Sequence, residues 1–147
     1  MRRRLLLACL FLLGSLAGCS EPVGPETQIR ANIMAMESAL SERSPGDFLE
    51  HLAESFTGGK QGSGDVTRDD AKRMLGVYFL RYRNVDILVS QVDVEIDAYE
   101  DALATSSAMV ALAGGRGLIP DSARLYQVTG RWQNFDGDWK LTRLSWE

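Results

Sequence analysis

Histidine and cysteine are scarce in this 147-residue sequence, which has one histidine and two cysteines. Both cysteines, Cys9 and Cys19, lie near the N-terminus, so residues 20–147 can form no disulfide and offer no thiol for catalysis. A zinc site needs several histidine or cysteine ligands, and His51 alone cannot supply them. No loop has the ligand spacing of a calcium site either. We therefore expect no metal and no cofactor.

Long hydrophobic runs and excess positive charge are also missing. The longest apolar stretch, Leu5–Cys19, is shorter than the ~20 residues that a membrane-spanning helix needs. The formal net charge is −4, and it falls to −7 without Arg2, Arg3 and Arg4. Such an acidic balance disfavours nucleic acid and anionic lipid as partners of the folded part. With 45% hydrophobic and 24% charged residues, the composition is that of one globular domain.

The N-terminus has the layout of a secretory signal peptide. Residues Met1–Arg4 are positively charged, an apolar segment (5–13) follows, and small residues lead up to Gly18. We predict that residues 1–18 are removed by cleavage between Gly18 and Cys19. The alternative is a plain secretory signal that ends in a cysteine by chance.

The segment Leu16-Ala17-Gly18-Cys19 resembles the lipobox of bacterial lipoproteins. The resemblance implies that Cys19 becomes the first residue, carries two acyl chains on a glycerol and usually a third, such as palmitate, on its amine. At ~0.8 kcal/mol per buried CH₂, two or more chains hold a protein stably on a bilayer. Residues 19–25 then form the lipidated cysteine and a tether. Ser20 at the next position implies a place in the cell envelope on the outer membrane, facing the periplasm.

Three helices are predicted in the first half of the remaining chain. The first lies between Pro25 and Pro45, the second begins at the capping pattern Ser44–Asp47, and the third begins at the capping pattern Thr67–Asp70. Residues 57–65 are expected to form a loop. Each predicted helix has an apolar stripe. The stripes are, in chain order, Ile29, Ile33, Met36 and Leu40; Phe48, Leu49, Leu52 and Phe56; and Ala71, Met74, Leu75, Tyr78 and Tyr82.

From Val85 onward the hydrophobic period changes to two, which predicts strands. The alternation changes parity near Ser90-Gln91, which indicates a bulge. Acidic residues after that point alternate with valine and isoleucine, and we expect them to point outward. The four strands are expected at about residues 85–97, 104–112, 123–135 and 138–146.

Asp136-Gly137 is the strongest local signal, because this pair is typical of a two-residue hairpin turn. The turn sets the register of the last two strands, so that Trp132 faces Leu141 on one side of the sheet. The register predicts a core face of Val128, Trp132, Trp139 and Leu141, and an outer face whose apolar end, a candidate interface, is Leu125, Leu144 and Trp146.

Helices followed by strands are an α+β order, and the lack of βαβ alternation argues against a parallel sheet. We expect three N-terminal helices packed on a curved, bulged antiparallel sheet of about four strands. This order and the ending Ala123–Leu141 resemble the nuclear transport factor 2-like (SnoaL-like) superfamily over residues 26–147. The resemblance looks closest to small uncharacterised bacterial lipoproteins, and it implies a cone-shaped domain around a pocket.

The superfamily does not define one activity. It includes ketosteroid isomerases, polyketide cyclases, dehydratases and epoxide hydrolases, and also many non-catalytic binding proteins. Cyclases of the superfamily typically use an Asp–His pair. Asp47 and His51 are the one such pair in this sequence, and a surface pair one helical turn apart explains them as well.

An isomerase-type site needs a carboxyl base and a tyrosine or aspartate donor in the pocket. No carboxylate is predicted to point inward, and tyrosines are often core residues. Arg143 has two predicted positions: opposite Gly130 in the pocket, where it could hold an anion, or outward if a second bulge lies near Thr142. The candidate pocket residues are Tyr78, Tyr82, Tyr126, Trp132 and Arg143.

The function predicted from the sequence is that of a non-catalytic envelope lipoprotein. Its domain binds a small molecule or an envelope protein, contacts the bilayer through acylated Cys19, and forms a homodimer through the outer sheet face. The alternative is a small isomerase- or cyclase-type enzyme that uses a pocket tyrosine or the Asp47–His51 pair.

Overall fold

The computed structural model describes residues 23–61, 65–115 and 122–147. The predicted signal peptide (1–18) and Cys19 lie outside these residues, so their assignment stays a prediction. Within the described residues, every helix is too short or too polar to cross a membrane.

The three predicted helices are present, and their first residues explain where they begin. α1 (Pro25–Ser41) and α2 (Pro45–Glu50) each start with a proline, whose φ is preset for a first helical turn. α3 (Arg68–Arg81) starts after a capping box in which Thr67 and Asp70 satisfy each other's backbone N–H groups. α2 is shorter than predicted, because it ends at Glu50 and the chain then enters the sheet.

Over the described residues the sheet has six strands, not the four that the sequence predicts. They are β1 (Leu52–Lys60), β2 (Val66–Thr67), β3 (Asn84–Ile96), β4 (Leu103–Gly115), β5 (Ser122–Phe135) and β6 (Asp138–Trp146). Across the sheet the order is β2-β1-β6-β5-β4-β3, so that β2 and β3 are the edges.

β1 is not predicted from the sequence. The spacing of Leu52 and Phe56 fits a helix, but both residues are buried on a strand. β1 pairs in parallel with β6, with Thr57 opposite Arg143, and antiparallel with β2. The expectation of a wholly antiparallel sheet is therefore wrong as well. Local periodicity cannot reveal a pairing between residues so far apart in the chain.

The β5–β6 hairpin has the predicted turn and the predicted register beside it. Asp136 (φ 54°) and Gly137 (φ 96°) both have positive φ, as this two-residue turn requires. Trp132 lies opposite Leu141, and both side chains are at most 2% exposed. The core face of the hairpin is confirmed.

Farther from the turn, the pairing of β6 with β5 shifts by one residue at Thr142. Because side chains alternate along a strand, this shift moves each following residue to the other face. Leu144 thus lies opposite Gly130, the position that an unbulged strand gives to Arg143. The bulge in β3 is also present, with Gln91 at a φ of 52°.

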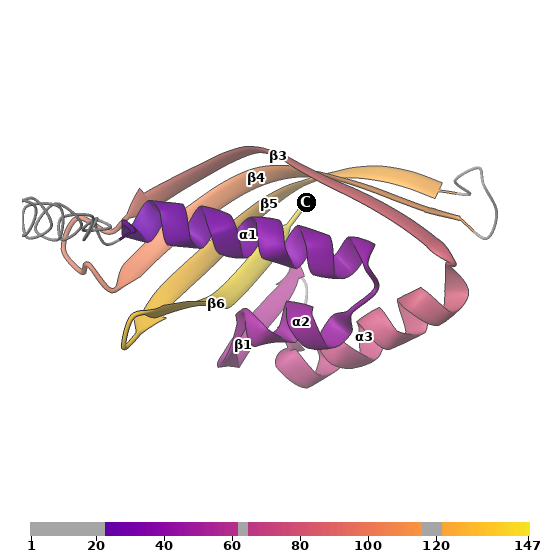
Figure 1. Ribbon diagram of the computed structural model, residues 1–147, viewed down its shortest axis with the longest axis horizontal. Coiled ribbons are helices and arrows are strands. Elements are labelled where there is room, and N and C mark those ends of the chain that lie inside the picture. The colour runs from indigo at the N-terminus through magenta and orange to yellow at the C-terminus, as the bar shows by residue number, and fades with distance from the viewer. Residues whose placement is uncertain (1–22, 62–64, 116–121) are drawn as a thin grey trace, which may run out of the picture.

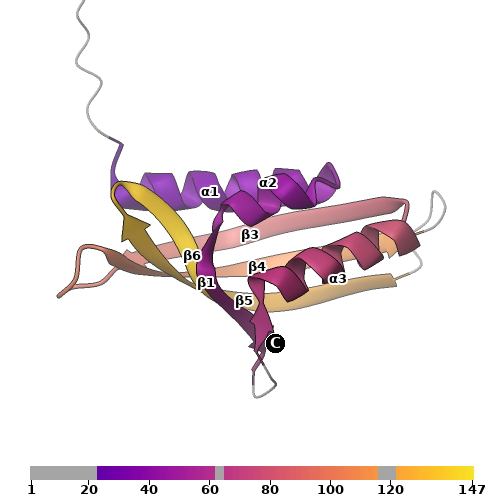
Figure 2. The ribbon, with the colours of Figure 1, turned by 90° about the horizontal axis from the view of Figure 1, so that it is seen from below.

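The sheet is curved, and α1 lies along its concave face (Figure 1). α3 lies under the same face, near the start of β3. Seen from below, α1 and α3 occupy separate places under the sheet (Figure 2). The core fills the space between α1 and the concave face, and its largest fully buried side chains are Trp132, Trp139, Ile29 and Leu141.

Candidate functional site

An apolar cavity of about 160 Å³ lies between α1 and the concave face of the sheet. Trp132 and Leu141 form part of its wall, together with Leu144, which the β6 bulge turns inward. Aliphatic side chains of α1, β3, β4 and β5 supply most of the rest. Burial of apolar surface is favourable by roughly 25 cal/mol per Å², so this wall suits an apolar ligand.

One internal hydrogen bond fixes part of the cavity wall. The indole Nε1 of Trp132 donates to Ser106 Oγ at 2.9 Å, and both residues are buried. The contact needs a glycine at position 130, because a Cβ there would lie 2.8 Å from Ser106 Oγ and 2.9 Å from Leu141 Cδ1. Trp132 therefore has its single donor satisfied and turns an apolar ring toward the cavity.

Glu37 is the carboxylate on the described part of the cavity wall, and it is not among the site residues predicted from the sequence. Its Oε1 accepts a hydrogen bond from the backbone N–H of Val89 at 3.0 Å, on the edge strand β3. The signal was in the sequence: Ile33, Glu37 and Leu40 are spaced i, i+4, i+7, so Glu37 lies within the apolar stripe of α1.

A second apolar cavity, of about 210 Å³, adjoins the first and shares Leu40 and Ile87 with it. Tyr78 lines this cavity, and its ring centroid is 4.7 Å from that of Tyr82. A Cβ at Gly114 would lie 2.7 Å from the Tyr78 hydroxyl, so only glycine allows this approach.

Tyr126 belongs to the same end of the concave face. It lies opposite Val110 on β4, whose side chain lines the first cavity. Burial raises the pKa of the Tyr78 hydroxyl above its usual value, and Tyr82 and Tyr126 raise it further. Tyr78 is consequently a neutral phenol at neutral pH, able to donate a hydrogen bond but not to act as a base.

The Asp47–His51 pair lies away from both cavities. His51 is the C-cap residue that follows α2, and Asp47 accepts a hydrogen bond from Ser44 Oγ at 2.6 Å. Burial and the charge of Lys140 lower the pKa of His51, so the ring is neutral at pH 7. Neither residue is on the described wall of either cavity, so the described contacts place no Asp–His pair beside them.

The remaining predicted residues are distributed over both faces. Arg143 takes the outward position, 3.3 Å from Asp65 Oδ1. Leu144 and Trp146 turn to the concave side because of the bulge, with Trp146 opposite Val128. Leu125 stays on the convex face and is 65% exposed. The outer apolar patch predicted from Leu125, Leu144 and Trp146 is therefore not one surface, because one extra residue in β6 separates its members.

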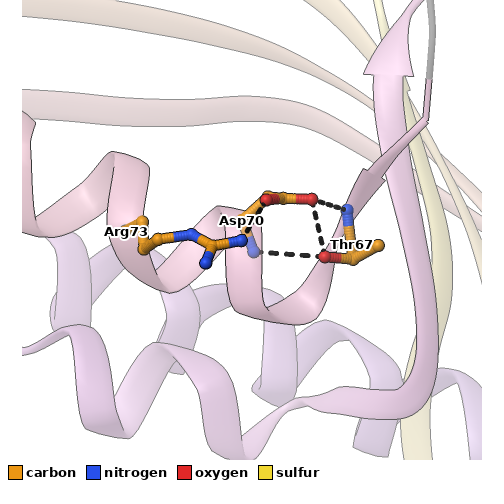
Figure 3. Close-up of polar contacts among 3 residues, drawn as sticks. All are labelled: Thr67, Asp70 and Arg73. Carbon is orange, nitrogen blue, oxygen red and sulfur yellow. Dashed lines mark hydrogen bonds and ion pairs between the residues drawn. The ribbon is translucent and has the colours of Figure 1, made fainter.

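Among the described carboxyl groups, Asp70 has the largest pKa shift, and its role is structural. Asp70 accepts hydrogen bonds from Thr67 and Arg73 at the start of α3, which lower its pKa to about 2 (Figure 3). These contacts cap the helix at the surface and reach no cavity. No cluster of potential metal ligands occurs among the described residues.

The sequence matches no protein-family model and no curated protein. Solved structures do match. An NTF2-like protein of unknown function from Pseudomonas putida has a TM-score of 0.69 and 13% identity, over 83% of this chain and 84% of that one. A putative dehydratase of the NTF2-like family from Streptomyces avermitilis has a TM-score of 0.68 and 12% identity, over 81% and 91%.

A putative scytalone dehydratase from Novosphingobium aromaticivorans is also similar, with a TM-score of 0.64 and 17% identity over 82% of this chain and 80% of that one. At identities this low, the likeness concerns the fold and not the activity. The three helices, the curved sheet and these matches together assign the chain the nuclear transport factor 2-like fold.

Proposed function

We propose that this protein is a non-catalytic, lipid-anchored envelope protein that binds a small apolar molecule between α1 and the concave face of the sheet. The observation that carries the proposal is the nearly wholly apolar cavity beside Trp132. Apolar cavities of this kind bind apolar ligands because water gains few hydrogen bonds inside them. The adjoining cavity at Tyr78 extends the apolar space, so an elongated ligand suits it best.

The chemistry of the wall favours binding over catalysis. An isomerase-type site needs a carboxyl base and a hydrogen-bond donor within reach of the same substrate. The described wall of the first cavity offers one carboxylate, Glu37, and the hydroxyl of Ser106, which already accepts the Trp132 indole N–H. Asp47 and His51 are outside it.

The anchor is proposed from the N-terminal sequence. Acylation of Cys19 leaves a tether of a few residues before Pro25, where α1 begins. The tether keeps the domain close to a bilayer, which is itself a source of apolar ligands. Mass spectrometry of the N-terminal peptide from membrane-purified protein tests this step. An acylated Cys19 is expected, and a mature protein with an unmodified N-terminus would contradict it.

A second candidate is an enzyme of the dehydratase or isomerase type, and two observations favour it. Two of the similar structures carry putative dehydratase names, and Glu37 stands on the cavity wall as a potential base. A binding protein returns its ligand unchanged after prolonged incubation, whereas an enzyme converts it. Analysis of the bound compound before and after incubation separates the two.

The cavity is tested by extracting ligand from protein purified out of its native membrane. Ala108 lines the cavity on β4, and Ala111 lies on the opposite face of the same strand, paired with Leu88 and Leu125. Wild type and Ala111→Leu are expected to release the same apolar compound into organic solvent, and Ala108→Leu much less of it. Equal amounts from all three proteins would contradict binding in this cavity.

The convex face that the proposed homodimer would use is smaller than the sequence predicts, because Leu144 and Trp146 are on the concave side. Leu88 and Leu125, 61% and 65% exposed, are paired through Ala111 on the convex face. Sedimentation of wild type and Leu125→Glu tests this contact. A dimer that persists in the variant would show that this face is not the interface.

A further inference from the structure

We propose that the ligand of this cavity carries a positively charged amine at one end of its apolar body, and that Glu37 receives that amine. The inference rests on the proposed function and names the class of molecule that the cavity selects. It follows from the charge of the wall, from the contacts of Glu37 and from the positions of the nearby arginines.

Glu37 is the one charged side chain on the described wall of the first cavity. The other described lining residues are apolar except Ser106, a neutral hydroxyl whose Oγ accepts the Trp132 indole N–H. An apolar molecule in this cavity thus meets a single strong polar group, and the position of that group sets where the molecule's own polar end lies.

The hydrogen bonding of Glu37 is incomplete. Its Oε1 accepts the Val89 N–H at 3.0 Å, and the described contacts give Oε2 no partner. A carboxylate has two oxygens and about four acceptor positions, so Glu37 keeps most of its capacity for a donor from the ligand. An ammonium group has three donors and the opposite charge, which makes it the best match.

No described basic side chain neutralises Glu37. On the same helix, Arg30 donates to the carbonyl of Val92 at 2.6 Å and lies 4.0 Å from Asp93 Oδ1. Arg43, just beyond the helix, donates to the carbonyl of Phe79 and stacks on its ring. Beside an apolar wall, where the effective dielectric constant is below that of water, an unmatched negative charge attracts cations and repels carboxylates.

Glu37 also has a structural role, which the test must keep intact. By accepting the Val89 N–H, it covers part of the exposed edge of β3. Glu37→Gln preserves this contact, because the amide oxygen of glutamine accepts the same hydrogen bond, and it removes the charge alone. Glu26→Gln is the matched control, since it removes one charge from the exposed first turn of the same helix.

The experiment compares octylamine, octanol and octanoate, which share a chain length and differ in head group. Their affinities are measured by calorimetry with the full-length protein in lipid nanodiscs, with empty nanodiscs as the blank. In wild type and Glu26→Gln, octylamine is expected to bind about tenfold more tightly than octanol, a difference of about 1.4 kcal/mol, and octanoate most weakly. In Glu37→Gln, octylamine and octanol are expected to bind equally, with the affinity for octanol unchanged.

Equal affinities for octylamine and octanol in wild type would overturn the inference, as would an octylamine preference that survives in Glu37→Gln. Ala108→Leu separates these failures from failure of the proposed function. If Ala108→Leu weakens all three probes while no charge preference is seen, the cavity binds apolar molecules and only the role of Glu37 is wrong. If no probe binds to wild type, both proposals are overturned.

Discussion

Two carboxylates of this protein are in opposite chemical situations: Asp70 at the start of α3 and Glu37 on α1. Asp70 is at the surface and accepts hydrogen bonds from Thr67 and Arg73, which hold its pKa at about 2. Glu37 accepts one backbone N–H and otherwise faces an apolar cavity.

The difference shows that a strongly shifted pKa does not by itself mark a functional site. Asp70 bonds to the N-cap Thr67 and to Arg73 of the same helix, so both of its oxygens already have donors in the folded protein. Glu37 has a described partner for Oε1 alone, so its second oxygen can accept a hydrogen bond from a ligand. Substitutions at these two positions therefore separate effects on folding from effects on binding.

The largest effect is expected where the cavity wall is also the core. Trp132→Ala removes a side chain that is 2% exposed, and we expect it to lower the free energy of unfolding by ~3–5 kcal/mol. Urea denaturation measures this change. Phe135→Ala, on the same strand but 43% exposed, is the control. A loss below ~0.5 kcal/mol for Trp132→Ala, typical of surface positions, would show that the indole is not part of the core.

A smaller effect is expected at the cap of α3. Thr67→Ala removes the side-chain acceptor of the Asp70 N–H and is expected to lower the free energy of unfolding by ~1 kcal/mol. Because the cap reaches no cavity, the affinity for octylamine should not change. Calorimetric titration and urea denaturation of the same preparation test both statements. Thr27→Ala, at an exposed position inside α1, is the control, and a loss of octylamine binding in Thr67→Ala would contradict the separation.

Glu37→Gln is expected to have the reverse pattern, with reduced amine binding and little effect on folding. Its free energy of unfolding should stay within ~0.5 kcal/mol of wild type, because glutamine still accepts the Val89 N–H. Glu37→Ala leaves that N–H without its acceptor and should cost ~1–3 kcal/mol. Thermal or urea unfolding of both variants measures the contrast, and equal losses would show that the hydrogen bond to Val89 is unimportant.

The smallest expected effect is the acid sensitivity of the cap. The pKa of Asp70 is lowered from 3.8 to about 2 on folding, so its contribution to stability is present above pH 3.8 and is lost as the pH falls toward 2. The protection of the first amides of α3 against hydrogen exchange, measured relative to their intrinsic exchange rate at each pH, should fall over that range in wild type. In Asp70→Asn the same amides should show no step there, and a step that remains would assign it to another group.

Elements with strong local signals were predictable. The prolines before α1 and α2, the Thr67–Asp70 capping box and the Asp136–Gly137 turn each act within a few residues. The bulge at Ser90-Gln91 was visible because the alternation itself changes parity there. These features depend on backbone geometry that the neighbouring residues impose.

The site itself was only partly predictable. Trp132 followed from the hairpin register, because a two-residue turn sets the pairing of the strands next to it. Glu37 was not predicted because a carboxylate on an amphipathic helix is usually assigned to the solvent side, even where its spacing places it within the apolar stripe. The cavity that makes it notable exists only once α1 lies against β3.

The sequence by itself determined the three helix starts, the last four strands and the core face of the terminal hairpin, because caps, turns and alternation act over short distances. The tertiary structure decided that Leu52–Lys60 is a strand, since its partner β6 lies at the other end of the chain. It also decided that Arg143 points out while Leu144 points in. One extra residue in β6 exchanges the faces of the residues that follow it. The pairing of β6 with β5 shows that the extra residue is at Thr142.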